Sequence, residues 1–224
     1  MEQRRDSATA YIILADGFET IEALTPLDVL RRCGLEVTTI SLNKTRAVRS
    51  SHGVTVEADA TMEDFMHNCN CCASAIGTGN AGTSSSAGSS TTASSANTTA
   101  GSCLRQALIL PGGYPGYKNL CESAEVGALI TQFHKEGKLL CAICGAPTAL
   151  KANQICRGAA ITCHTSVKEE LSDYYSILSS AVVKYMNIIT GMGAGRSLDF
   201  AFAIAEALTS KEKVEEIKAK MEII

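Results

Sequence analysis

The sequence predicts an α/β protein in which helices cover both faces of a mostly parallel sheet. Short apolar runs alternate with segments of helical period along most of the chain. Three of these runs end in turn or small residues, at 16–17, 111–113 and 144, and sheets of this class form their sites at such strand ends. The chain has 224 residues, 46% of them hydrophobic, which is enough for the core of one domain spanning 1–224.

The first half of the chain begins with a buried-type strand at 10–15, where six residues include no charge. A helical pattern covers 19–33 and is ended by Gly34, since glycine accommodates the conformation that follows a helix. A second strand pattern covers 35–40. The alternating residues 54–56 predict a short arm of an edge hairpin.

The second half repeats the alternation. An apolar strand at 107–110 is closed by a Pro-Gly-Gly turn, and a helical pattern follows at 126–134. Further strands are expected at 138–143 and 160–163, and 182–184 with 187–190 form a final hairpin. Helical patterns at 198–208 and 211–221 end the chain. Strands that alternate with helices favour parallel pairing.

An insertion is predicted at 68–103, where the composition changes abruptly. Residues 82–101 consist only of Ser, Thr, Ala, Gly and Asn. Such a segment has little apolar surface to offset the entropy lost on ordering, so we expect a low-complexity surface loop. Loop closure entropy grows slowly with length, and the domain tolerates the insertion.

Cys144 is the most informative residue, because an apolar strand runs directly into it. Small residues follow and then a helix-compatible run, which is the layout of a nucleophile elbow, a tight turn that lifts one side chain to the edge of the sheet. The positive end of a helix favours a thiolate there. Strand alternation places Cys141 and Ile143 in packing and Cys144 at the turn. We expect a reactive Cys144; the alternative is a small buried thiol.

Charge and hydropathy narrow the class of protein. The formal net charge of −3 provides no basic field for nucleic acid, and no apolar run is long enough to span a bilayer. The N-terminus has charges but lacks the apolar stretch of a signal peptide. The ten cysteines are irregularly spaced, which favours free thiols over a disulfide framework. We expect a cytoplasmic protein that binds neither nucleic acid nor membrane.

Four segments carry a family resemblance: DGFETIE at 16–22, LPGG at 110–113, AICGAP at 142–147 and GAGRSLDF at 193–200. In this order they resemble the ThiJ/PfpI superfamily, in the branch of the parkinsonism-associated protein deglycase. The resemblance covers nearly everything outside the insertion. It implies a flavodoxin-like (Rossmann-like) three-layer sandwich, commonly a homodimer, with a reactive cysteine at the elbow.

The resemblance also implies roles for further residues. Glu22 matches a glutamate that hydrogen-bonds the cysteine, and a carboxyl in apolar surroundings stays protonated, donates to a thiolate and shuttles protons. His164 matches a histidine near the cysteine, for polar support or proton transfer. The backbone amides of Gly113 and Gly145 match donors that face an oxyanion.

Each of these residues could instead have a purely structural role and take no part in the chemistry. Glu22 could be an ordinary solvated helix carboxylate, with Glu19 as a reserve candidate that is expected to be more exposed. His164 could cap the end of a strand. Gly112 and Gly113 could simply form a tight turn.

Two positions depart from the family pattern. His52 stands where many relatives carry an arginine that reaches toward the pocket across the dimer, which weakens the case for an anion site built on a permanent charge. Gly145 stands where protease relatives place a histidine directly after the cysteine. The adjacent Cys-His pair is therefore absent, and proteolysis is not expected.

The expected chemistry is addition to a small carbonyl compound. Cys144 would attack the aldehyde of methylglyoxal or glyoxal, and Glu22 with His164 would move protons through an enediol. Hydrolysis would release a 2-hydroxy acid such as lactate without glutathione, cofactor or metal. The same addition to glycated proteins would be deglycase activity.

Two other function classes remain open from the sequence. Cys144 could be a peroxide sensor, oxidised to sulfinate and stabilised by Glu22, in a protein with a chaperone-like protective role. The chain could also be a binding module for small molecules without chemistry. The enzyme and the sensor use the same residues, so the sequence does not separate them.

His67, Cys69, Cys71, Cys72 and Cys103 bracket the insertion. Such residues can bind a soft metal such as zinc, but their spacing fits no standard zinc knuckle. We expect an incidental cluster and no metal site. Exposed, redox-labile thiols are the intermediate interpretation.

Overall fold

The computed structural model describes residues 9–68 and 106–223. The predicted insertion at 68–103 lies outside this part of the chain except for its first residue, so its character as a surface loop stays a prediction.

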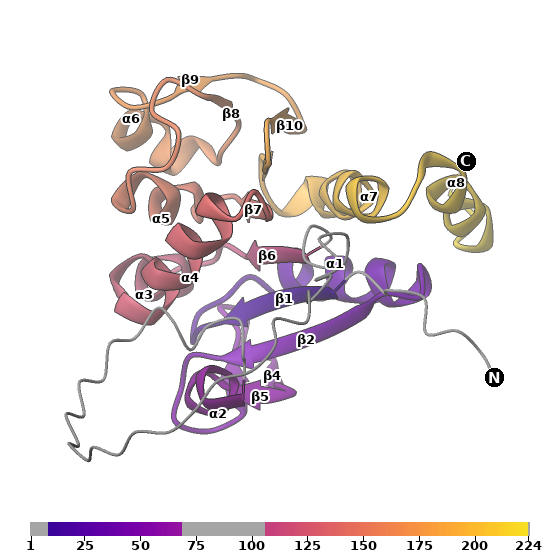
Figure 1. Cartoon of the computed structure of the whole chain (residues 1–224), viewed down its shortest axis with the longest axis horizontal. Helices are drawn as coiled ribbons and strands as arrows, with labels where there is room; N and C mark the ends of the chain where they lie inside the picture. The colour runs from indigo at the N-terminus through magenta and orange to yellow at the C-terminus, as the bar shows by residue number, and fades with distance from the viewer. Residues whose placement is uncertain (1–8, 69–105, 224) are drawn as a thin grey trace, which may run out of the picture.

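A seven-stranded sheet forms the centre of the protein, with the strand order β10-β11-β7-β6-β1-β2-β5 (Figure 1). All neighbouring strands are parallel except β10 and β11, which form an antiparallel hairpin. The predicted mostly parallel sheet is therefore confirmed. Its strands are β1 (Thr9–Leu14), β2 (Glu36–Ser41), β5 (Ala60–Thr61), β6 (Gln106–Leu110), β7 (Leu139–Ile143), β10 (Val182–Tyr185) and β11 (Ile188–Gly191).

Helices cover both faces of this sheet, as predicted (Figure 1). One layer consists of α1 (Thr20–Arg32), α7 (Ser197–Leu208) and α8 (Lys211–Lys220), whose buried side chains join one apolar cluster. The opposite layer consists of α2 (Met62–Asn68), α3 (Gly116–Glu122), α4 (Ala124–Lys135) and α5 (Pro147–Ala152). Buried side chains of these helices belong to a second apolar cluster.

Strand alternation divides the core between these clusters. Ile12 and Leu14 of β1 belong to the cluster under α1 and α7, whereas Ile13 between them belongs to the cluster under α4. All three side chains are fully buried. A parallel strand covered on both faces is apolar at successive positions for this reason, which explains why the strand patterns read as continuous apolar runs.

The short elements were the hardest to predict. The edge arm β4 (Thr55–Glu57) is confirmed, but its partner β3 (Ala47–Arg49) carried no recognisable pattern. The strand expected at 160–163 is shorter than predicted: β8 covers Ala160–Ile161 and pairs with β9 (Ser176–Ile177) in a separate small sheet. Two residues are too few to show a period in the sequence. The pairing of such short strands is decided by the surrounding fold. The remaining elements are η1 (Thr165–Val167), α6 (Lys168–Leu171) and η2 (Ala194–Arg196).

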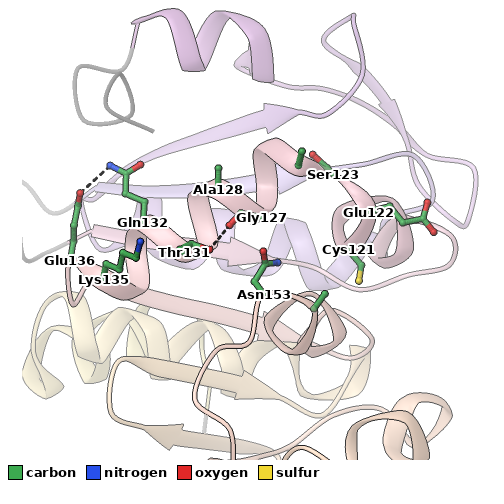
Figure 2. Close-up of a pocket in the computed structure, with 12 residues that line it drawn as sticks. Cys121, Glu122, Ser123, Gly127, Ala128, Thr131, Gln132, Lys135, Glu136 and Asn153 are labelled. Atoms are coloured by element: carbon green, nitrogen blue, oxygen red, sulfur yellow. Dashed lines mark hydrogen bonds between the residues drawn. The ribbon is translucent and has the colours of Figure 1, made fainter. Parts of the chain in front are cut away.

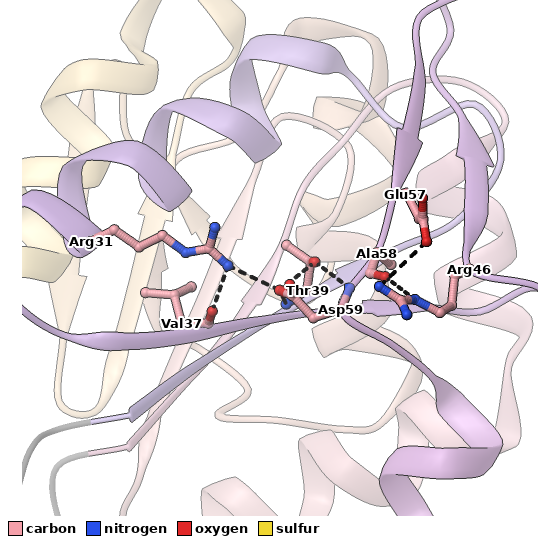
Figure 3. A network of polar contacts seen from close by, with 7 residues as sticks. All are labelled: Arg31, Val37, Thr39, Arg46, Glu57, Ala58 and Asp59. Carbon is pink, nitrogen blue, oxygen red and sulfur yellow. Dashed lines mark hydrogen bonds and ion pairs between the residues drawn. The ribbon is translucent and has the colours of Figure 1, made fainter.

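A polar network around Asp59 joins the end of α1 to the edge of the sheet (Figure 3). Asp59 Oδ2 accepts hydrogen bonds from the backbone N–H and the hydroxyl of Thr39, both at 2.8 Å, and from Arg31 Nη2 at 3.0 Å. The Asp59 N–H donates in return to Thr39 Oγ1 at 2.9 Å. Burial raises the pKa of Asp59, but these hydrogen bonds and the Arg31 charge outweigh it and hold the pKa below its ordinary value.

The substitution Asp59→Asn should lower the free energy of unfolding by about 1 kcal/mol at pH 7, because the charge-assisted part of these partly exposed hydrogen bonds is lost. A carboxylate whose pKa is depressed on folding stabilises above its unfolded pKa, and the contribution disappears as the pH falls through its folded pKa. Urea unfolding at a series of pH values should therefore show the two proteins diverging at neutral pH and converging in acid.

Asp28→Asn is the matched control. Asp28 makes one exposed ion pair with Arg32 at 2.7 Å, and its loss should cost less than about 0.5 kcal/mol. Equal losses in the two variants would contradict the role assigned to the Asp59 network.

Candidate active site

The carboxyl ends of β1, β6 and β7 meet at one edge of the sheet, as expected for sites in this fold class. The segments that follow these strands line a cavity of about 730 Å³. Four of the predicted site residues line it: Glu22, Gly113, Cys144 and His164. The structure thus brings together residues separated by up to 142 positions in the chain.

Cys144 follows β7 directly and has a left-handed backbone conformation, with φ of +65°. A non-glycine residue rarely adopts this conformation, and neighbouring strands hold it there. The Cys144 N–H donates to the Gly191 carbonyl at 3.0 Å, and its carbonyl accepts from the His164 N–H at 2.9 Å. The predicted elbow is confirmed, as is the burial of Cys141 and Ile143 on the strand.

Two backbone amides, rather than a long helix, provide the positive environment of the sulfur. The helix after the elbow, α5, has only six residues. The N–H groups of Gly113 and Gly145 hydrogen-bond the Cys144 sulfur and lower its pKa. These are the two donors predicted for an oxyanion.

Glu22 lies in the first turn of α1 and is fully buried. Its Oε2 accepts a hydrogen bond from the Gly112 N–H at 2.9 Å, and its carboxyl group hydrogen-bonds Cys144. Its Oε1 is buried and has no partner within the described part of the chain. The interpretation of Glu22 as a solvated helix carboxylate is therefore wrong.

Glu19 has a different role from its neighbour. It is the N-cap of α1, and its Oε2 accepts a hydrogen bond from the Glu22 N–H at 2.8 Å. Its side chain is 14% exposed, so Glu19 is more exposed than the fully buried Glu22, as expected, although most of it is covered. The cap fixes the start of the helix and so the position of Glu22.

Burial decides the protonation of the Glu22–Cys144 pair. It raises the pKa of Glu22 to about 7, and the nearby charge of Glu19 adds to this. Burial, together with the charge of Glu22, raises the pKa of the Cys144 thiol to about 12. The thiol is therefore not ionised at neutral pH by its own environment, in contrast to the sequence-based expectation.

The two groups titrate as one pair, because each lies against the other. The first proton leaves the pair near pH 7, and the second leaves only at high pH. Above pH 7 the pair holds one charge and one proton, which can lie on the carboxyl or on the sulfur. A thiolate at Cys144 thus requires that Glu22 holds the proton.

Glycine is needed at two positions of the turn after β6. A Cβ atom at Gly112 would lie 2.6 Å from both Cys144 Cβ and Glu22 Oε2. Gly113 has a φ of +89°, and a Cβ atom there would lie 2.3 Å from the Glu19 nitrogen. Because neither glycine has a side chain, the backbone of this turn can approach Glu22 and Cys144 closely.

His164 caps the short helix η1 and not the end of a strand, and its predicted role in proton transfer stays a prediction. Its Nδ1 accepts from the Ser166 N–H at 3.2 Å, so the histidine caps η1. Since Nδ1 is an acceptor, the neutral ring carries its proton on Nε2. The ring is exposed and lines the cavity beside Glu22 and Cys144.

Exposed side chains form the rim of the cavity. His52 lies there with its Nδ1 3.8 Å from Glu19 Oε1. Arg196 also lines the cavity and has its Nη1 3.5 Å from Asp199 Oδ2. Arg196, which sequence reasoning did not single out, thus places a permanent charge at the rim from the turn after β11. Its position at a strand end in a family-like motif was the available signal.

A second cavity of about 710 Å³ lies along α4 (Figure 2). It is lined by Cys121, Lys135 and Asn153 among others, from α3, α4 and the end of α5. Burial raises the pKa of the Cys121 thiol, and among the described residues it is the Thr148 side chain, and not a carboxyl group, that hydrogen-bonds it. Cys121 therefore lacks the arrangement found at Cys144.

Within residues 9–68 and 106–223, no three His, Cys, Asp or Glu side chains gather in a way that could hold a metal ion. His67 lies in α2, but Cys69, Cys71, Cys72 and Cys103 lie outside the described residues, so the predicted incidental cluster is untested. The described helices include none long and apolar enough to cross a membrane.

Comparison with known proteins identifies similar chains. A model of the DJ-1/PfpI family matches residues 8–207. Protein dj-1beta of Drosophila melanogaster is 32% identical over 212 residues, which cover 94% of this chain and 95% of that protein. Its crystal structure superposes with a TM-score of 0.78 over 97% of this chain and 99% of that chain, at 31% identity.

Two further relatives extend the comparison. The Parkinson disease protein 7 homolog of Danio rerio is 31% identical over 214 residues, covering 95% of both chains. A protein of Caenorhabditis elegans named glutathione-independent glyoxalase DJR-1.2 is 38% identical over 107 residues, which cover 47% of this chain and 56% of that protein.

Alkylation of Cys144 by iodoacetamide should increase with pH around a midpoint near 7, where the pair loses its first proton. Glu22→Gln should remove this midpoint and slow alkylation at pH 7 by about tenfold or more, because the buried thiol then has no acid–base partner and ionises only at higher pH. Mass spectrometry of the Cys144 peptide after timed alkylation measures both effects.

Glu19→Gln is the control, because the amide oxygen can still cap α1 while the charge is lost. Since the Glu19 charge raises the pKa of Glu22, this variant should move the midpoint to lower pH by less than about one unit. If Glu22→Gln retained the wild-type midpoint, the coupled pair would be refuted.

Proposed function

The chain belongs to the DJ-1/PfpI family, and from this membership and its site geometry we propose that it is a glutathione-independent glyoxalase. It converts 2-oxoaldehydes such as methylglyoxal into 2-hydroxy acids. The observation that carries the proposal is the buried Glu22 carboxyl hydrogen-bonded to Cys144, with two backbone N–H donors on the same sulfur. The nematode relative, named glutathione-independent glyoxalase DJR-1.2, supports the same activity.

The reaction begins when the Cys144 thiolate adds to the aldehyde carbon and forms a hemithioacetal. The N–H groups of Gly113 and Gly145 stabilise the oxygen that gains charge. Glu22 holds the proton that would otherwise quench the sulfur, and it transfers protons as the reaction proceeds.

The next step moves hydrogen between the two carbons of the substrate. A proton leaves the former aldehyde carbon, an enediol forms, and the neighbouring carbon is protonated. The first carbon is oxidised and the second reduced, so no external oxidant or reductant is required. Water then hydrolyses the resulting thioester, which releases the 2-hydroxy acid and restores Cys144.

The same addition extends to glycated proteins. A hemithioacetal or aminocarbinol adduct first releases the thiol or amine of the glycated side chain, which takes up the hydroxyl proton and regenerates the free aldehyde, and Cys144 then adds to that carbon; an exposed rim leaves room for the remainder of a protein substrate. Deglycase activity is therefore part of the proposal, and it uses the same residues.

The second candidate function is peroxide sensing at Cys144. Glu22 Oε1, which has no hydrogen-bond partner among the described residues, favours it, because a protonated carboxyl with such an oxygen can bind the oxygens that sulfur gains on oxidation to sulfinate. In this function the protein would act as a protective partner and not as an enzyme.

We also propose a homodimer. Ile21 on α1 and Leu198 on α7 are 48% and 43% exposed, and these two helices pack against each other. The β3–β4 arm carries Val54, which is 46% exposed, and Thr20 at the start of α1 hydrogen-bonds Ser50 of this arm at 2.9 Å. These exposed apolar side chains support an interface on this side of the molecule.

The substitution Cys144→Ala should abolish lactate formation from methylglyoxal, with a fall in kcat/KM of at least about a thousandfold, because the nucleophile is lost. Thermal unfolding should show that the fold is retained. Cys121→Ala, which removes a partly buried thiol from the second cavity, should retain activity.

Wild-type turnover in the Cys144→Ala variant would refute the glyoxalase proposal. Mass spectrometry after mild peroxide treatment separates the two candidate functions. Selective oxidation of Cys144 without any turnover of glyoxals would favour the sensor over the enzyme.

The substitution His164→Asn should lower kcat by about tenfold to a hundredfold, because the amide oxygen can replace Nδ1 as the cap of η1 but nothing replaces Nε2. The melting temperature should change little. Ser166→Ala is the control for the Nδ1 side of the ring: it removes the Ser166 hydroxyl 2.8 Å from His164 Nδ1 but keeps the backbone N–H that the histidine caps, and it should leave kcat within about twofold of the wild type. An unchanged kcat in His164→Asn would show that the histidine only caps η1 and takes no part in proton transfer.

Sedimentation velocity should give twice the mass of one chain, and Ile21→Glu should shift the protein to monomers, because a charge would be buried at the interface. Met186→Glu is the matched control: Met186 is 81% exposed at the β10–β11 turn, and this variant should remain dimeric. A monomeric wild-type protein at high micromolar concentration would refute the dimer.

A further inference from the structure

Tyr114 is an aromatic residue in the wall of the cavity that holds the Cys144 sulfur. It follows Gly113, whose N–H hydrogen-bonds Cys144, and consecutive Cα atoms are about 3.8 Å apart. Its side chain lines the cavity and is 67% exposed. A substrate bonded to Cys144, with its oxygen at the Gly113 N–H, therefore lies next to Tyr114.

The backbone around Tyr114 is held firmly. The Gly113 carbonyl accepts from the Tyr117 N–H at 2.9 Å, and the Pro115 carbonyl accepts from the Lys118 N–H at 2.9 Å. These hydrogen bonds lead into α3, so the turn that carries the tyrosine is anchored on both sides. The Cα atom of Tyr114 thus has a defined position at the cavity, from which the ring extends.

Neighbouring side chains restrain the ring but leave most of it in solvent. Lys118 Nζ lies 5.5 Å from the centroid of the Tyr114 ring, and the Tyr117 ring lies 6.4 Å away at an angle of 57°. Tyr117 packs close to Gly145, where a Cβ atom would be 2.7 Å from Tyr117 Cδ1. With two-thirds of its surface exposed, Tyr114 contributes little to the core, and its ring is free to contact a ligand.

We propose that Tyr114 determines substrate specificity: its ring stacks on an aromatic substituent of the carbonyl compound bound at Cys144 and favours aryl 2-oxoaldehydes over methylglyoxal. This inference rests on the proposed function, because it concerns the substrates of the same cysteine. Aromatic rings gain from offset or edge-to-face contact beyond the area that they bury. Methylglyoxal has only a methyl group at this position and cannot make the contact.

Alkylation of Cys144 tests the stacking contact without requiring turnover. The wild-type protein is treated with 2-iodo-N-phenylacetamide and with iodoacetamide, and the ratio of the two rates at Cys144 is measured by mass spectrometry. Tyr114→Ala should lower this ratio by about threefold to tenfold, whereas Tyr114→Phe, which keeps the ring, should leave it unchanged. Tyr185→Ala removes a 37% exposed tyrosine from the β10–β11 hairpin and should also leave it unchanged.

Initial rates with phenylglyoxal and methylglyoxal provide the second measurement. The ratio of their kcat/KM values should fall in Tyr114→Ala by the same factor and stay unchanged in Tyr114→Phe. Wild-type ratios in Tyr114→Ala, with turnover intact, would overturn the inference while leaving the proposed function standing. A reduced alkylation ratio without turnover of either aldehyde would support the contact and refute the glyoxalase. A Cys144 that reacts with neither iodo compound would overturn both.

Discussion

The contact between the Glu22 carboxyl and the Cys144 sulfur is the interaction on which the geometry of the site and its proposed chemistry depend. In water each group would ionise independently, near its ordinary pKa. Burial makes a charge on either group costly, and their proximity makes two charges more costly still. The pair therefore keeps one proton over a wide pH range around neutrality and above. This shared proton makes the sulfur a nucleophile when it lies on Glu22, and it makes the carboxyl a base when it lies on the sulfur.

The fold maintains this contact through local geometry that few sequences permit. Cys144 adopts a left-handed backbone conformation at the end of β7, held by hydrogen bonds to the β11 end and to His164. Gly112 lets the β6 turn approach both members of the pair, and Glu19 caps the helix that carries Glu22. The parallel sheet brings these segments to one edge. The core on both faces of the sheet supplies the stability that offsets the strained elbow.

Interior and rim have separate roles in the site. In the proposed function the interior supplies the nucleophile, the acid–base group and two amide donors, which would suffice for addition to many small carbonyl compounds. The rim carries longer, exposed side chains, namely Tyr114, His52 and Arg196. Exposed residues can change without disturbing the buried pair, so specificity can vary within the family while the chemistry is kept. In this chain the rim combines an aromatic ring with a permanent positive charge supplied by Arg196 and not by position 52.

The sequence by itself determined the parallel α/β architecture and the elbow at Cys144, and its resemblance to a known family pointed to Glu22, Gly113, Gly145 and His164, which the structure brings around Cys144. Strand period, helix period and short family-like motifs are properties of neighbouring residues, so they can be read locally. Only the tertiary structure decided the protonation of the Glu22–Cys144 pair, the half-buried cap at Glu19, the short strand pairs β3–β4 and β8–β9, and the presence of Arg196 and Tyr114 in the cavity wall. Glu22 and Gly112 are 90 residues apart, and their hydrogen bond forms only when the sheet brings β6 beside β1. Burial and pKa shifts arise from such distant contacts, and no local pattern in the chain encodes them.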